Sequence, residues 1–99
     1  IENNYVARDA CTYSADRLYN STISRLVTDT NAIAFSNFAN SSFELIAEVE
    51  GLAINIESQL INGIVYNGEG EIDTTTYPYT ISLTYQQGSA ICIAEYSLQ

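Results

Sequence analysis

The sequence predicts a single α+β domain in which an N-terminal helix packs on a small antiparallel sheet that ends in a C-terminal hairpin. Three observations support this fold class: a stripe of apolar residues at helical spacing in residues 5–27, strict alternation in residues 77–99, and one cysteine in each of these segments. The length of 99 residues suits one domain covering residues 1–99, and no linker or internal repeat divides it.

The first segment, residues 5–27, has apolar or small residues every three to four positions. Such spacing places side chains on one face of an α-helix and predicts an amphipathic helix. The stripe consists of Ala7, Cys11, Ala15, Leu18, Thr22 and Leu26, with Tyr19 and Ile23 alongside.

Cys11 lies in this stripe and Cys92 lies in the last predicted strand. The chain has two cysteines and no histidine, so a metal site built on the cysteines would lack further His or Cys ligands. The sequence therefore predicts a disulfide between the first helix and the sheet. In the chain-entropy model, closing so long a loop stabilises the fold by about 4–5 kcal/mol.

Residues 28–42 are predicted to be a connection, and residues 42–61 allow two interpretations. A capping box from Ser41 to Glu44 and the stop signal Asn62-Gly63 favour a second helix over 42–61. Alternating apolar residues with a turn at Gly51 indicate two strands instead. The cap and stop signals favour the helix, and the strands remain the alternative.

The remaining residues predict strands. A short strand at 64–66, a turn at Asn67-Gly68 and a looser return precede the C-terminal hairpin. The hairpin turns at Gln86-Gln87-Gly88-Ser89, and its apolar face predicts a register. The predicted pairs are Tyr85 with Ala90, Leu83 with Cys92, Ile81 with Ala94 and Tyr79 with Tyr96, and Tyr77 is assigned to the same core.

The formal net charge of −9 is carried entirely by residues 29–99, because the three arginines lie in residues 1–28 and are balanced there by three acids. This charge argues against ordinary nucleic-acid binding. A basic partner, bound cations, acidic or salty surroundings, or solubility alone would each account for it.

Catalysis is not expected. Without histidine or lysine the chain lacks an ordinary general base and a Schiff-base nucleophile. Paired carboxylates could in principle cleave a glycosidic bond, but a solvated acidic face is the favoured interpretation. The carboxylate candidates are Glu44, Glu48 and Glu50, or Glu69, Glu71 and Asp73. The last three are also a weak Ca²⁺ candidate that lacks EF-hand spacing, so no metal and no cofactor are predicted.

A secreted, extracellular or periplasmic location is predicted from the cysteine pair and from a composition rich in hydroxyl and amide side chains. The sequons at Asn20 and Asn40 are candidate glycosylation sites. The chain starts with Ile1, which indicates a processed product or a piece of a longer chain, and it has no apolar run long enough for a transmembrane segment.

The expected function is that of a secreted, non-enzymatic assembly or binding module, such as a subunit of an extracellular filament, with a protein partner or self-association. An edge strand at 77–85 or 91–98 would be the natural place for subunits to add. Tyr5, Tyr13 and Tyr66 are the candidate contact residues, because tyrosine gives a large contact area at low entropic cost. The alternative is a small secreted toxin or enzyme inhibitor.

Overall fold

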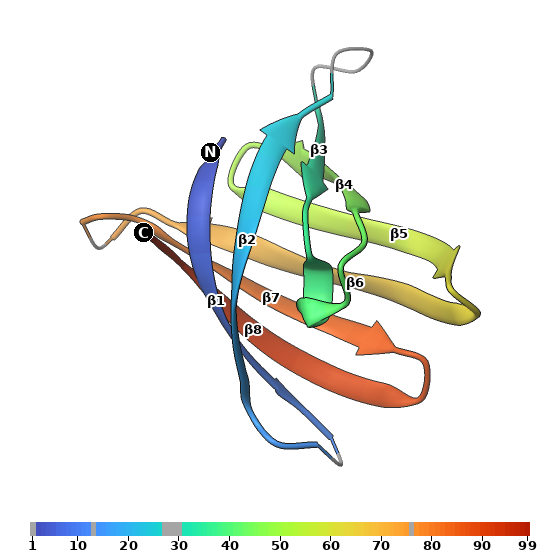
Figure 1. Ribbon diagram of the computed structural model, residues 1–99. Helices are drawn as coiled ribbons and strands as arrows, with labels where there is room; N and C mark the ends of the chain where they lie inside the picture. The colour runs from blue at the N-terminus through green and yellow to red at the C-terminus, as the bar shows by residue number, and fades with distance from the viewer. Residues whose placement is uncertain (1, 13, 27–30, 76) are drawn as a thin grey trace.

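The computed structural model describes residues 2–12, 14–26, 31–75 and 77–99, and it is an all-β protein (Figure 1). The α+β prediction is therefore wrong. The described residues form a closed antiparallel barrel with one short 3₁₀ helix, η1. The elements are β1 (Asn3–Cys11), β2 (Arg17–Arg25), β3 (Ala32–Phe35), η1 (Phe38–Asn40), β4 (Leu45–Glu50), β5 (Ala53–Ile61), β6 (Ile64–Asp73), β7 (Thr80–Gln87) and β8 (Ala90–Leu98).

Each strand pairs with the next one along the chain, and β1 pairs with β8 to close the barrel. Figure 1 shows β5 to β8 side by side, with β2 and β3 running across them at a steep angle. Closure gives each strand a neighbour on both sides. The predicted edge strands at 77–85 and 91–98 are therefore not edges, because β7 lies between β6 and β8, and β8 lies between β7 and β1.

The predicted N-terminal helix over 5–27 is instead the β1–β2 hairpin. The reason lies in which side chains face inward. The buried positions alternate, but they include Asp9 and Ser21, while Leu18 points outward and is 66% exposed. Polar residues inside and an apolar residue outside hide the period of two, and the helical stripe is a coincidence.

The second predicted helix, over 42–61, is also wrong, and the strand alternative is correct. β4 and β5 turn at Gly51, whose φ of 61° suits a residue without a side chain. The sequence signal read as a helix stop, Asn62-Gly63, is the turn between β5 and β6, with φ values of 52° and 79°.

β6 runs without interruption through the predicted turn at Asn67-Gly68. Gly68 and Gly70 are needed there because β6 approaches β7 closely. An added Cβ on Gly70 would lie 2.2 Å from the carbonyl oxygen of Ser82, and one on Gly68 would lie 2.4 Å from that of Thr84. These glycines therefore permit close strand contact rather than a turn.

The C-terminal hairpin is present, but its register differs by two residues from the prediction. Gln87 pairs with Ala90 and Tyr85 with Cys92, so the loop is Gly88-Ser89. Because strand side chains alternate with a period of two, this shift leaves the same face inside. Tyr85 and Tyr96 are buried as predicted and Tyr79 is half-buried, whereas Tyr77 is fully exposed.

The two ends of the barrel differ. At one end the segment after β3, which contains η1, folds into the barrel, and its residues Phe38 and Ala39 are buried. The Phe38 ring lies 4.7 Å from that of Tyr85, centroid to centroid, so η1 plugs this end. At the other end lie the β4–β5 turn, the end of β2 and the segment before β7, and this end has no comparable plug among the described residues.

Candidate functional site

The outer face of β4 to β8 carries an acidic groove of about 950 Å³. Its lining includes four exposed glutamates: Glu48 and Glu50 of β4 and Glu69 and Glu71 of β6. No arginine is among the described residues that line it. We call this surface the acidic groove.

Strand register places these glutamates together. Glu48 lies opposite Asn55 of β5, which in turn lies opposite Glu69 of β6. In the next row Glu50 and Glu71 flank Ala53 in the same way. Two glutamates are therefore separated by one short side chain in each row, which leaves a hollow between them. Part of the net charge of −9 that residues 29–99 carry is thus concentrated on one surface.

The four carboxylates give this groove a negative charge that would complement cations and basic side chains. A glycosidase requires one carboxyl group in an apolar environment so that it stays protonated. All four glutamates are exposed to solvent, and Glu44 lies in the segment before β4, outside the groove.

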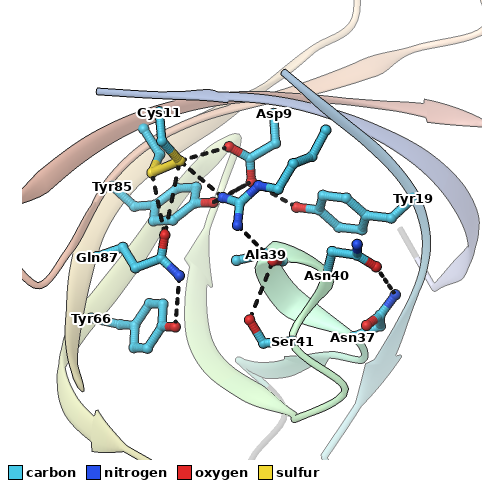
Figure 2. Close-up of polar contacts among 12 residues, drawn as sticks. Asp9, Cys11, Tyr19, Asn37, Ala39, Asn40, Ser41, Tyr66, Tyr85 and Gln87 are labelled. Atoms are coloured by element: carbon cyan, nitrogen blue, oxygen red, sulfur yellow. Dashed lines mark hydrogen bonds and ion pairs between the residues drawn. A yellow bond between two sulfur atoms is a disulfide. The ribbon is translucent and has the colours of Figure 1, made fainter. Parts of the chain in front are cut away.

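A second polar cluster lies inside the plugged end, centred on Asp9 (Figure 2). The Asp9 carboxylate is fully buried and forms an ion pair of 3.2 Å with Arg17. It also accepts hydrogen bonds from the hydroxyls of Tyr19, at 3.0 Å, and Tyr85. Arg17 in turn donates to the carbonyl oxygen of Ala39 at 2.9 Å, which ties η1 to the barrel wall.

The disulfide between Cys11 and Cys92 borders this cluster. This bond confirms the predicted cysteine pairing, although it joins two strands rather than a helix and a strand. Cys11 lies directly opposite Cys92 in the β1–β8 pairing. Arg17 Nη2 lies 2.9 Å from Cys11 Sγ, and Asp9 Oδ1 lies 3.3 Å from it. The latter is a contact only, because a disulfide sulfur has no proton to donate.

The tyrosines around Asp9 remain neutral. Burial raises the pKa of Tyr85, and its hydrogen bond to Asp9 raises it further. Burial also raises the pKa of Tyr19, with further contributions from Tyr96 and Tyr85. The pKa of Tyr96 is raised by burial to about 12. Neutral phenols can donate hydrogen bonds to the Asp9 carboxylate, so the cluster is suited to a structural role.

Two of the three predicted contact tyrosines are buried. Tyr5 is 0% exposed and Tyr66 is 1% exposed, because both side chains point into the barrel. The Tyr5 hydroxyl lies 2.8 Å from that of Tyr79, and Tyr66 accepts a hydrogen bond from Gln87. Tyr13 lies outside the described residues.

The predicted Ca²⁺ ligands are on the outer side of β6, at alternate positions along an extended strand. Asp73 Oδ1 accepts a hydrogen bond of 2.9 Å from the backbone N–H of Thr75, so this carboxylate stabilises the local turn that follows β6. The hydrogen bond that the Thr75 hydroxyl donates to this carboxylate, together with the one from the backbone N–H, lowers the pKa of Asp73. Within the described residues, the one converging set of three metal-ligating side chains is Asp9 with Cys11 and Cys92, whose sulfurs are joined and offer no thiolate.

Both sequon asparagines are exposed. Asn20 lies in β2, where its side-chain oxygen accepts a hydrogen bond of 3.0 Å from Gln99. Asn40 is the last residue of η1, with a φ of 58°. Their glycosylation remains a prediction.

The Asp9–Arg17 cluster was not predicted from the sequence. The available signal was a set of polar residues at the inward positions of two alternating segments, Asp9 and Ser21 with Arg17. A helical interpretation of residues 5–27 distributes these residues around the helix and hides the pattern.

In the described part of the chain, no helix has the length and apolar character to cross a membrane. No protein-family model matches the chain, and neither does any curated protein or solved structure.

Proposed function

We propose that the protein is a secreted, non-enzymatic binding module whose acidic groove receives a basic segment of a partner protein. The observation that carries this proposal is the placement of Glu48, Glu50, Glu69 and Glu71 around one hollow, with no arginine among its described lining residues. A lysine- or arginine-rich segment would bring charges that complement this surface.

The disulfide supports the location, because such bonds persist in oxidising compartments. The strong negative charge supports the exclusion of nucleic acid as a partner. Filament assembly by strand addition receives no support, since barrel closure leaves β7 and β8 paired on both sides. Self-association would have to use side-chain surfaces.

The hollow shape bears on the alternative function. An inhibitor that blocks an enzyme cleft inserts a projecting segment, whereas the acidic groove is a surface that receives one. This geometry favours a binding module over a toxin or inhibitor.

The test is a titration of the ¹⁵N-labelled protein with an oligolysine peptide, in which binding is monitored through the amide chemical shifts. We expect shifts in β4 to β6 that weaken as salt is added, because exposed charges are screened. The double substitution Glu48→Gln/Glu69→Gln should lower the affinity about threefold to tenfold.

The matched control is Glu2→Gln/Glu44→Gln, which removes the same charge away from the groove. If the control lowers affinity as much as the groove variant, the peptide senses only the net charge and the proposal fails.

A further inference from the structure

The end of the barrel opposite η1 contains a cavity of about 460 Å³, which we call the mouth. Its wall includes the inward-facing side chains of Ile33, Val49 and Ile72, the half-buried Tyr79 and the exposed Leu52 of the β4–β5 turn. This volume is in the range of small-molecule sites, which often occupy the mouths of β-barrels.

The charge of the mouth is opposite to that of the acidic groove. Arg25, the last residue of β2, lines the mouth, and no acid is among the described residues that line it. The other two arginines are placed elsewhere. Arg17 is bound inside the plugged end, and Arg8 lies on the outer face opposite Glu95.

Arg25 is held only weakly by its present partner. Its Nε lies 3.5 Å from Glu2 Oε1, and the two side chains are 55% and 54% exposed. Exposed ion pairs of this kind contribute little to stability, so an incoming carboxylate can replace Glu2. Deeper in the barrel, the hydroxyls of Tyr5 and Tyr79 are hydrogen-bonded to each other. The wall of the mouth is partly polar, because Asn31 and Thr74 line it together with the apolar side chains.

We infer that the mouth binds a small amphipathic carboxylate, with its hydrocarbon part against Ile33, Val49 and Ile72 and its carboxylate on Arg25. Apolar contact with the wall supplies affinity, and the charge-assisted hydrogen bonds of the guanidinium select the anionic head group. The mouth borders the acidic groove, and Asn31, Val49 and Gly51 line both. The charged residues differ, because the four glutamates line only the groove and Arg25 lines only the mouth, so either proposal can fail without the other.

The test is titration of the ¹⁵N-labelled protein with octanoate, compared with octanol, which has the same chain length and no charge. We expect octanoate to shift the amides of Ile33, Val49, Leu52 and Ile72 and to bind more tightly than octanol. The amide spectrum also shows directly that each variant is folded.

Three exposed substitutions separate the contributions. Arg25→Gln should weaken octanoate binding about fivefold to tenfold and leave octanol binding unchanged. Arg8→Gln changes the net charge equally and should change neither. Glu2→Gln should tighten octanoate binding up to about fivefold, because it releases Arg25.

The inference is overturned if octanoate causes no shifts at the mouth, if octanol binds as tightly as octanoate, or if Arg25→Gln and Arg8→Gln have the same effect. A Glu2→Gln variant that binds octanoate no better than the parent would contradict the proposed exchange of partners on Arg25.

Discussion

Arg17 connects three parts of the plugged end: Asp9 of β1, the carbonyl oxygen of Ala39 in η1, and the sulfur of Cys11. Its partner Asp9 is fully buried, whereas Arg17 itself keeps a quarter of its side chain exposed. A buried charge that loses its partner is much more costly than the pair is favourable. The stability of this end therefore depends on keeping the two residues together.

Arg17→Met is expected to lower the free energy of unfolding by about 3 kcal/mol, because it leaves the Asp9 carboxylate buried without a counter-charge. The double variant Asp9→Asn/Arg17→Met should recover part of this loss, because it removes the unpaired charge. Urea denaturation measures both. Arg8→Met on the exposed outer face is the control and should change the free energy of unfolding by less than about 0.5 kcal/mol. If Arg17→Met and Arg8→Met lowered stability equally, the burial of Asp9 would not be the cause.

At the same scale, the sequence identified the cysteine pair but not its surroundings. The pairing followed from counting two cysteines without metal-ligand partners, which requires no secondary structure. The position of Asp9 beside Arg17 depends on strand register. A one-residue difference in register would have placed Asp9 outside, so composition and spacing alone do not reveal the cluster.

Among the elements, β6 is the one whose residues conflict most with local preference. It contains Gly68 and Gly70, which disfavour a strand, and the Asn67-Gly68 pair is a turn signal. The strand forms because neighbouring strands cover both of its sides and because the glycines admit the backbone of β7. Tertiary packing here overrides local propensity.

Gly70→Ala is therefore expected to destabilise the barrel by about 1–3 kcal/mol, since its Cβ would meet a backbone oxygen and the side chain of Leu83 within 2.5 Å. Gly51→Ala provides a comparison: no atom lies within 4 Å of an added Cβ, and only the positive φ opposes the change, at about 1 kcal/mol. Thermal or urea unfolding of the two variants measures the difference. A Gly51→Ala variant less stable than Gly70→Ala would contradict a role for close strand contact.

The predictability of the elements follows the same physics. The C-terminal hairpin was found because its inward face is almost wholly apolar, so its period of two is visible. The β1–β2 hairpin was mistaken for a helix because Asp9, Arg17 and Ser21 take inward positions. The β4–β5 hairpin was available as an alternative, and the cap and stop signals that favoured a helix proved to be a loop and a β-turn.

For the whole molecule, the interior is unusually rich in phenol groups. Tyr5, Tyr19, Tyr85 and Tyr96 all have a raised pKa, and burial is the main cause for each. Among the described residues, the Tyr96 hydroxyl has no hydrogen-bond partner in bonding geometry, although the nearby hydroxyls of Tyr19 and Ser21 offset part of the pKa increase caused by burial. Ionising these groups in place is unfavourable, so the barrel must open for them to lose their protons.

Stability should consequently fall at alkaline pH. Below about pH 10, the ordinary value, the tyrosines are protonated in both states and their contribution is complete; as the pH rises from 10 towards 12, the unfolded chain loses protons that the native state retains. Tyr96 alone would account for about 2–3 kcal/mol by pH 12. Phenolate absorbance and circular dichroism, followed together, should change in one transition.

Tyr96→Phe tests the assignment. This variant should keep its stability near neutral pH to within about 1 kcal/mol, because no hydrogen bond is lost, and its alkaline transition should move to higher pH. Tyrosine ionisation that is complete while the circular dichroism remains native would contradict the proposed coupling between these phenols and the fold.

The disulfide joins residues that are 81 positions apart, and these residues face each other across the contact between the first and the last strand. The two thiols can meet in this arrangement only after the chain has travelled once around the barrel. Formation of the disulfide should therefore follow pairing of the first and last strands. Alkylation of free thiols at successive times during refolding would measure the fraction of molecules in which these strands have not yet paired.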